Sequence, residues 1–454
     1  MTAAYQEIQG ALSISAIFAV IITVSEFISR KFNPSPEFTR KFVHINGGIA
    51  CLFFPFFVKS HCTVLILAAS FSLLFYAGSK MDFLKCLHGV ERKTRGSEYY
   101  PFAIWLLFFL SIDRLWLYFS SVLVLTAADA CAALIGEKYG SIRYKVGDSY
   151  KSLEGSVFFW IIAFLAIHIP MLLLSDLPRE TCILSALLVS FLMTCTEAVS
   201  VRGTDNIFVP ALTAYILLKI TMKPVPEIAF QCASLFAIFA VFGLIIWRSR
   251  LLDIGAGLIF LGISYASWSL GSFQWALPAF VAFLLFSAVR YVLNRKKVQP
   301  VIKASTLFAV LVVPFAILVF ANSFDIYGEF FGLYLTAYVM IASFSVWRTI
   351  LRAYVHEDPP RRIRILGGVS TAIVAWLLIC LPVWLIQDST SLSALVGILG
   401  IAIFFTLLHE SMLRKQDFGK DTSWTDARFV LTLMSIAACW TLQQFHLTGL
   451  WNLN

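Results

Sequence analysis

The sequence has 454 residues, of which 59% are hydrophobic and 13% are charged, and its net charge is +9. A soluble domain carries roughly 25% charged and 45–50% apolar residues, so this composition excludes an ordinary soluble enzyme, a disordered chain and a small disulfide scaffold. The positive charge alone would also suit a nucleic-acid-binding protein, but the apolar excess favours Lys and Arg held in the loops of a membrane protein, with no nucleic-acid partner.

Apolar runs recur along the whole chain. A helix that crosses a bilayer needs about 20 mainly apolar residues. The fourth run is short, which is typical of a tilted or re-entrant helix or of one merged with the fifth. We expect an all-α integral membrane protein, a polytopic helical bundle of about 14–16 transmembrane helices. The runs lie at 11–29, 42–58, 61–78, 101–112, 115–136, 156–174, 181–200, 207–222, 227–247, 251–270, 272–290, 302–321, 330–352, 365–386, 391–409 and 427–446.

The basic residues predict how these helices are oriented. With the N-terminus on the non-cytoplasmic side, every second loop is cytoplasmic and holds Lys and Arg, as the positive-inside rule requires. An even number of spans then places the C-terminus on the non-cytoplasmic side too. The membrane is the bacterial inner membrane, or the endoplasmic reticulum or a plastid membrane in a eukaryote. The exceptions among the 35 basic residues are Lys59, Arg114, Arg179, Lys219 and Lys223.

The loops divide the chain into two predicted domains. Up to residue 222 the cytoplasmic loops combine Asp, Glu, Asn, Gly and Lys, whereas the later ones are mainly basic. We place the boundary near Lys223–Pro226, which gives a catalytic domain over 1–222 and a second helical domain over 223–454. The oligomeric state is left open.

The densest polar cluster begins inside the fifth apolar run. Asp129 precedes Gly136 by seven residues, about two helical turns, so both lie on one face with the small Ala132 and Ala133 between them. Ionisable residues at membrane depth are costly and therefore candidates for function. A structural contact between helices is the alternative for Asp129.

A loop rich in glycine and lysine follows this helix. Glycine leaves backbone N–H groups free to surround a phosphate, lysine supplies positive charge, and Mg²⁺ prefers one or two carboxylates with phosphate oxygens. This pattern predicts a site for a nucleotide and a metal, although positive-inside charge alone also explains the lysines. Its members are Gly136, Gly140, Lys145, Lys151, Glu154 and Gly155.

Three smaller polar clusters lie at other predicted cytoplasmic helix ends. A structural hydrogen bond is the alternative for His44, and a proton relay in a transporter is the alternative for Glu197. Four clusters on one side of the membrane favour a shared site facing the cytoplasm. The smaller clusters are Arg40, Lys41 and His44; Gly96 and Glu98; and Glu197, Asp205 and Asn206.

Together, these elements resemble the dolichol kinase and phytol kinase family of polyprenol kinases. The pattern D-x-x-A-A-x-x-G-x-x-x-G with K-x-x-E-G resembles the family's CTP-binding segment, with Asp129 as its first residue and Gly155 as its last. The early R-K-x-x-H, the G-x-E-Y-Y-P element and the late E…D-N-x-x-x-P occur in the family's order. The resemblance covers roughly residues 40–215.

This resemblance implies that the γ-phosphoryl group of CTP passes to the hydroxyl of a prenol of the phytol, geranylgeraniol, farnesol or dolichol type, with Mg²⁺ or another divalent cation. Asp129 would hold the metal or take the alcohol proton, and His44 and Glu197 would position or deprotonate the alcohol. Asp205 and Asn206 would complete the metal site. Lys41, Lys145, Lys151, Glu154 and the glycines would hold the nucleotide.

Two other functions remain open on the sequence. A phosphatidate cytidylyltransferase shares a similar CTP-binding core, and a multi-span transporter also places carboxylates near glycine breaks. The second half faintly resembles a phytyl-phosphate kinase-like membrane family, but residues 338–348 contain no carboxylate where that family has an acidic stretch. We expect this half to be a helical scaffold or a lipid-handling module.

Overall fold

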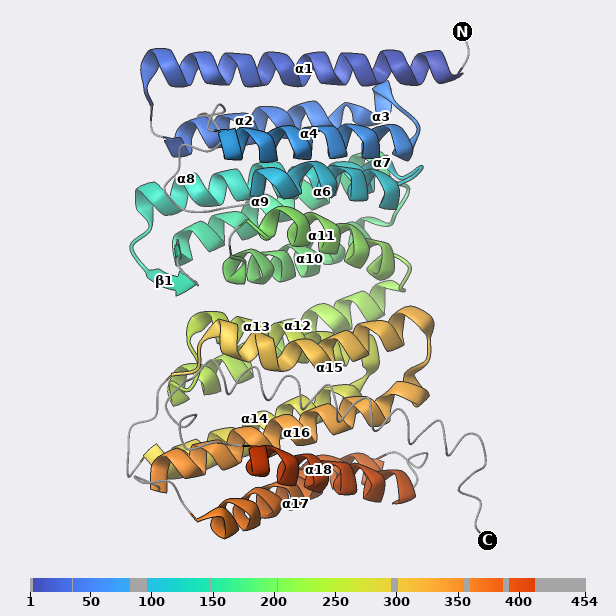
Figure 1. Cartoon of the computed structure of the whole chain (residues 1–454). Helices are drawn as coiled ribbons and strands as arrows, with labels where there is room; N and C mark the ends of the chain where they lie inside the picture. Colours follow the sequence, from blue (N-terminus) through green and yellow to red (C-terminus); the bar gives the residue numbers. More distant parts are fainter. Residues whose placement is uncertain are drawn as a thin grey trace. The chain divides into compact units, whose positions relative to one another are not determined.

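The computed structural model describes residues 3–34, 36–81, 96–146, 149–201, 203–294, 301–354, 360–386 and 392–412 (Figure 1). The predicted span at 427–446 and residues 82–95 of the loop after the third span lie outside these ranges. The chain divides into two compact units, residues 1–236 and 237–454. The catalytic role predicted for residues 1–222 and the scaffold or lipid-handling role predicted for residues 223–454 stay predictions.

The first unit is a bundle of helices joined by short connections. The order of the helices follows the apolar runs of the sequence, because a helix satisfies all backbone hydrogen-bonding groups of an apolar run within the run itself. The helices are α1 (Ala3–Phe32), α2 (Pro36–Leu52), α3 (Phe54–Phe57), α4 (His61–Met81), α6 (Gly96–Leu110), α7 (Leu115–Leu123), the π-helix η1 (Val124–Ala128), α8 (Asp129–Tyr139), α9 (Leu153–Leu174), α10 (Arg179–Val199) and α11 (Asp205–Ile220).

The second unit is also helical, and α16 lies at its centre. This helix packs against α14, α15, α17 and α18, and 78% of the residues in its 18-residue apolar stretch are buried. The Tyr334 hydroxyl on α16 donates to the Trp275 carbonyl at 2.7 Å and lies 2.9 Å from Ser267 Oγ. The helices are α12 (Val225–Ser249), which begins in the first unit, α13 (Ile254–Gly271), α14 (Phe273–Asn294), α15 (Ala304–Phe324), α16 (Tyr327–Tyr354), α17 (Arg361–Ile386) and α18 (Leu392–Met412).

Within the described ranges, eleven helical segments are long and apolar enough to cross a membrane. This confirms a polytopic all-α membrane protein. Several predicted spans form shorter helices: α2, α6 and α11 hold 17, 15 and 16 residues, at or below the lower limit of about 17 for a crossing. A turn at residues 111–113 separates α6 from α7, so the fourth and fifth runs are distinct helices. The sidedness of the termini stays a prediction.

The loop predicted after the fifth span contains a β-hairpin. Strands β1 (Arg143–Val146) and β2 (Ser149–Ser152) pair antiparallel, with Tyr144 opposite Lys151 and Lys145 opposite Tyr150. The strand residues alternate between buried and exposed side chains, which suits a strand with one face on the protein. Ser152 then caps α9, because its Oγ accepts the Gly155 N–H at 3.1 Å.

The fifth span is continuous from Leu115 to Tyr139 but changes winding in its middle. Residues 124–128 form the π-helix η1, which separates α7 from α8. A π-turn inside an α-helix shifts the hydrogen-bond register and is frequent at functional sites. Here it lies directly before Asp129, the first residue of α8.

Candidate active site

Asp129 binds a lysine that is distant in sequence. Lys41 Nζ on α2 lies 2.6 Å from Asp129 Oδ2 on α8 and 3.4 Å from the Asp129 backbone carbonyl. Lys41 is only 4% exposed. A buried ammonium needs a close counter-charge because burial removes its hydration, so this pair fixes α2 against the start of α8.

His44 approaches the same carboxylate one turn further along α2. Its Nε2 lies 2.9 Å from the Leu125 carbonyl and 3.4 Å from Asp129 Oδ2. Leu125 belongs to η1, where the altered winding makes a carbonyl available to a side chain. When Nε2 carries the proton, it donates to the Leu125 carbonyl, and this bond sets the tautomer and orientation of the imidazole.

Tyr100 and Thr126 complete the surroundings of His44. The Tyr100 ring meets the His44 ring edge to face at 5.1 Å, and its hydroxyl lies 3.4 Å from Thr126 Oγ1. Tyr100 belongs to the predicted G-x-E-Y-Y-P element, whereas Thr126 belongs to none of the predicted motifs. The π-helix that presents Thr126 has no distinct pattern in the sequence, so the residues alone did not reveal it.

A second lysine–carboxylate pair joins the hairpin to α10. Lys151 Nζ donates to Glu197 Oε1 at 2.6 Å and also contacts the Glu197 backbone carbonyl. That carbonyl lies in the last turn of α10, where the helix dipole favours a cation. Burial on its own would lower the Lys151 pKa, but the carboxylates of Glu197 and Asp205 outweigh it and hold the pKa above its ordinary value. Lys151 is therefore a persistent cation.

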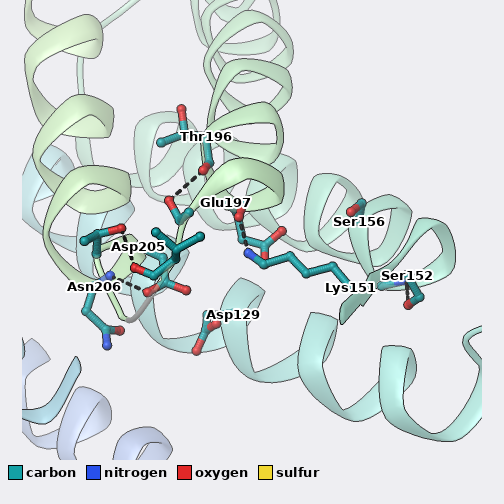
Figure 2. Close-up of polar contacts among 12 residues, drawn as sticks. Asp129, Lys151, Ser152, Ser156, Thr196, Glu197, Asp205 and Asn206 are labelled. Carbon is teal, nitrogen blue, oxygen red and sulfur yellow. Dashed lines mark hydrogen bonds and ion pairs between the residues drawn. The ribbon is translucent and has the colours of Figure 1, made fainter. Parts of the chain in front are cut away.

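Asp205 and Asn206 lie at the start of α11, close to this second pair. The Asp205 Oδ1 accepts the Asn206 N–H at 3.1 Å, and the Asp205 carboxylate interacts electrostatically with both Lys151 and Glu197. Figure 2 shows Asp129, Glu197 and Asp205 around the end of the Lys151 side chain. The structure thus brings the predicted acids of three helices and the predicted lysine of the hairpin into one cluster.

The predicted glycines pack α8 closely against α9. A Cβ added at Gly155 would lie 2.8 Å from the Ala132 carbonyl oxygen and 3.3 Å from Gly136 Cα, and one at Gly136 would lie 2.8 Å from Ser152 Oγ. Gly140 closes the end of α8 against the same serine. The close approach seen at these positions is therefore between two helices, with Ala132 and Ala133 on the helix that carries Gly136.

Glu154 and Lys145 lie outside the cluster. The Glu154 carboxylate accepts hydrogen bonds from the Ser141 hydroxyl and from the backbone N–H groups of Ser141 and Ile142, which ties the base of the hairpin together. Lys145 is exposed and follows Tyr144, whose buried side chain shares a face with Lys151. Because side chains alternate along a strand, Lys145 points away from the face that carries Lys151.

The remaining predicted residues have separate surroundings. The Arg40 charge acts on both Asp129 and His44. Gly96 begins α6, and the Glu98 backbone carbonyl accepts a hydrogen bond from Ser72 Oγ at 3.0 Å. Tyr144, which the sequence analysis did not select, shares a hydrogen bond of 2.9 Å with Ser156 Oγ and holds the inner face of the hairpin on α9.

The donor set is compatible with a metal that the protein holds only in part. Among the described residues, no group of three or more His, Cys, Asp or Glu side chains could hold a metal ion by itself. Mg²⁺ commonly takes one or two carboxylates and completes its shell with water and substrate phosphates. Within the cluster, Asp129 and Asp205 are the candidate carboxylates for such a shared site.

Comparison with known proteins identifies a family for part of this chain. No family model matches the chain, and no solved structure matches it. A curated relative, the phytol kinase of Synechocystis sp., is 30% identical over 214 residues, which is 45% of this chain and 88% of the relative. Since the match extends over nearly all of that enzyme, the chain belongs over this part of its length to the phytol kinase family.

Proposed function

We propose that the first unit is a prenol kinase that transfers the γ-phosphoryl group of CTP to the hydroxyl of a lipid alcohol such as phytol, geranylgeraniol, farnesol or dolichol. The observation that carries this proposal is the buried cluster of two lysine–carboxylate pairs with Asp205. Its kinship with a phytol kinase gives the acceptor class. Phosphoryl transfer needs alignment and charge neutralisation more than covalent chemistry, and this cluster supplies charged groups of both signs.

The position of the cluster suits a soluble donor and a membrane-bound acceptor. Glu197 lies in the last turn of α10, Asp205 begins α11, and Lys151 directly precedes α9. A lipid alcohol places its hydroxyl at the membrane interface, the depth at which such helix ends lie. A transporter site would instead lie near the bilayer midplane. The cluster therefore favours an enzyme fed with nucleotide from one side.

Lys151 is the residue that we assign to the phosphates. Its ammonium is held by Glu197. A triphosphate brings more negative charge than a carboxylate, so its oxygens would exchange with Glu197 as partners of Lys151. The released Glu197 carboxylate would then be available to position the alcohol, which couples nucleotide binding to acceptor binding.

Asp129 and His44 are the groups that we assign to the alcohol. Its oxygen would attack the γ-phosphorus, the bond between that phosphorus and the β–γ bridging oxygen would break, and CDP would leave. Asp129 would take the hydroxyl proton, while Lys41 and His44 hold its carboxylate in place. General-base help of this kind is worth about 10²–10⁴-fold. Mg²⁺ held by Asp205 and Asn206 would neutralise charge on the phosphates; if Asp129 instead holds the metal, His44 or Glu197 would take the proton.

Labelled CTP tests the proposal directly. Membranes that contain the full chain would be incubated with γ-labelled or α-labelled CTP and with phytol, farnesol, geranylgeraniol, a long polyprenol or diacylglycerol. We expect the γ label, and not the α label, in an extractable prenyl phosphate. Transfer of the α label would instead indicate a cytidylyltransferase, and absence of label from every lipid would overturn the kinase assignment.

A further inference from the structure

The outer face of the β-hairpin carries cations that the candidate active site does not use. Arg143 and Lys145 on β1 are exposed, and Tyr150, opposite Lys145 on β2, is 66% exposed. Directly paired residues point to the same side of a sheet, so Lys145 and Tyr150 lie side by side. Tyr144 and Lys151 form the opposite, inner face, which contacts α9 and α10.

The base of the hairpin is apolar. Ile142 and Leu153 flank the two strands and are joined by the hydrogen bond from the Leu153 N–H to the Ile142 carbonyl, yet they are 56% and 49% exposed. Tyr139, the last residue of α8, is 59% exposed, and Lys138 Nζ lies over its ring at 5.2 Å. Exposed aromatic and aliphatic side chains beside lysine are typical of the membrane–water interface.

The position of the hairpin in the chain places it at this interface. It connects two helices that are long enough to cross the membrane, Leu115–Tyr139 and Leu153–Leu174. Both ends of the hairpin are therefore fixed at the membrane surface. Its apolar base can contact the acyl boundary, while the strands extend among the lipid headgroups.

The cations on this face are available to a ligand. Among the described residues, Lys138, Arg143 and Lys145 form no ion pair. Arg143 is steadied by donating from its Nε to the Gly140 carbonyl at 3.2 Å. The nearby Glu154 is already bound to Ser141 and Ile142, and Glu137 is exposed among the described acids of this stretch. Guanidinium and ammonium groups beside an exposed aromatic ring suit a phosphodiester headgroup.

We propose that the outer face of the hairpin, formed by Arg143, Lys145 and Tyr150, binds the headgroup of an anionic phospholipid. The lipid phosphate meets the two cations, and its acyl chains follow Ile142 and Leu153 toward the bilayer. Binding there would seat the hairpin on the membrane while its other face carries Lys151. This inference does not depend on the reaction assigned to the chain, because it rests on the outer face alone.

Photocrosslinking from the hairpin tests this binding without an activity measurement. The full-length protein, with p-benzoylphenylalanine in place of Tyr150, would be placed in phosphatidylcholine nanodiscs containing 30% phosphatidylglycerol. After illumination, mass spectrometry identifies the attached lipid. One cation at a membrane surface contributes about 1 kcal/mol, or about fivefold, so we expect the ratio of phosphatidylglycerol to phosphatidylcholine among the crosslinked lipids to exceed their ratio in the bilayer by at least about fivefold.

Matched substitutions separate this site from general attraction to an acidic surface. Arg143→Gln with Lys145→Gln should reduce the enrichment to the bilayer share. Arg179→Gln with Lys219→Gln removes two exposed cations, at the start of α10 and in the last turn of α11, and should leave the enrichment unchanged. Wild-type crosslinking in proportion to the bilayer composition would overturn the proposal. Loss of the phosphatidylglycerol enrichment on addition of CTP would also overturn it, because the outer face would then belong to the nucleotide site.

Hydrogen exchange checks the result in the unmodified protein. Amides of residues 143–146 and 149–152 should exchange more slowly in nanodiscs with phosphatidylglycerol than in pure phosphatidylcholine. The difference should vanish in the Arg143→Gln, Lys145→Gln variant. Equal exchange of the wild-type hairpin in both bilayers would contradict the proposal even if the photoreactive variant failed to fold.

Discussion

At the scale of single residues, the candidate site is built from buried charges that are paired across long sequence separations. Lys41 and Asp129 are joined across 88 positions and Lys151 and Glu197 across 46. Loss of one partner of a buried pair typically costs about 3–5 kcal/mol, since the other charge remains without compensation. Each pair therefore stabilises the first unit, and in the proposed mechanism it also positions the groups assigned to the reaction.

Replacement of Asp129 tests the assigned base. Asp129→Asn keeps an oxygen that can accept from Lys41 but removes the carboxylate that would take the alcohol proton. We expect γ-phosphoryl transfer to phytol to fall by at least about 10²-fold, with normal membrane insertion. Asp176→Asn, at an exposed position, is the control and should retain activity. Wild-type turnover of Asp129→Asn would remove Asp129 from the proposed mechanism.

The raised Lys151 pKa gives a prediction about pH. A lysine whose folded pKa lies above its unfolded value stabilises the fold fully below the unfolded pKa, about 10.4, and this stabilisation is lost as the pH rises through the folded pKa. Wild type should therefore melt at a higher temperature than Lys151→Met by a constant margin from about pH 6 to 10, with a smaller margin above. Thermal unfolding in detergent across this range measures it. A margin that shrinks already near pH 8 would show that another group controls it.

At this scale the sequence indicated which residues belong to the cluster, but it did not indicate which residues pair with one another. Asp129 and Glu197 stood out because a carboxylate in an apolar run is costly unless it is satisfied. The ion pairs with Lys41 and Lys151 depend on how distant helices pack, which periodicity does not encode. Lys145 was expected beside Lys151, but the alternation of side chains in a strand separates them. No pattern revealed that strand in advance.

At the scale of elements, η1 and the contact of α2 with it determine where His44 lies. Gly48 follows His44 by one turn of α2, and a Cβ at Gly48 would overlap the Thr126 side chain of η1. Gly47 faces a looser region, where an added Cβ would lie 3.5 Å from Phe18 Cε1. The two neighbouring glycines therefore differ sharply in how much space they have.

Matched alanine substitutions test this contact. Gly48→Ala should push α2 away from η1, displace Lys41 and His44, and lower γ-phosphoryl transfer by about tenfold or more, since overpacking costs about 1–3 kcal/mol. Gly47→Ala should remain within about twofold of wild type. Initial rates at equal protein levels in membranes measure both variants. Equal activity of the two would show that α2 is not held through Gly48.

The contact between α8 and α9 gives a second prediction for an element. Gly155→Ala places a Cβ 2.8 Å from the Ala132 carbonyl oxygen, so we expect a loss of about 1–3 kcal/mol in the free energy of unfolding. Gly243→Ala on α12 is the control, because nothing lies within 4 Å of its added Cβ and alanine favours a helix by up to about 1 kcal/mol. Thermal unfolding should separate the two variants in opposite directions, and a stabilised Gly155→Ala would contradict the packing.

At the scale of the whole molecule, hydrophobicity was the strongest signal. Fifteen of the sixteen predicted runs coincide with helices of the described residues, because an apolar segment in a bilayer has few structures other than a helix. The same signal could not find the β-hairpin, whose strands of four residues are polar. It also could not show that α12 begins among the helices of the first unit. That placement depends on side-chain contacts.

Those contacts decide where the chain can be shortened. Cys232 Sγ on α12 lies 3.3 Å from the Leu184 carbonyl on α10, and the Phe236 ring meets Phe191 at 5.1 Å. A chain that ends at Arg250 keeps them, together with all residues assigned to the reaction. We therefore expect it to retain γ-phosphoryl transfer to phytol within about threefold, an expectation that rests on the division of the chain into two units.

A chain that ends at Met222 removes α12 and exposes the face of α10 that Cys232 and Phe236 cover. It should unfold at a lower temperature and lose activity in proportion, because uncovered helices lose packing contacts that the lipid does not restore in the same geometry. Size-exclusion profiles, thermal unfolding and labelled-CTP assays on both chains measure this. Inactivity of the longer chain with a normal melting temperature would show that residues after Arg250 take part in the reaction. The second unit would then be part of the catalytic machinery.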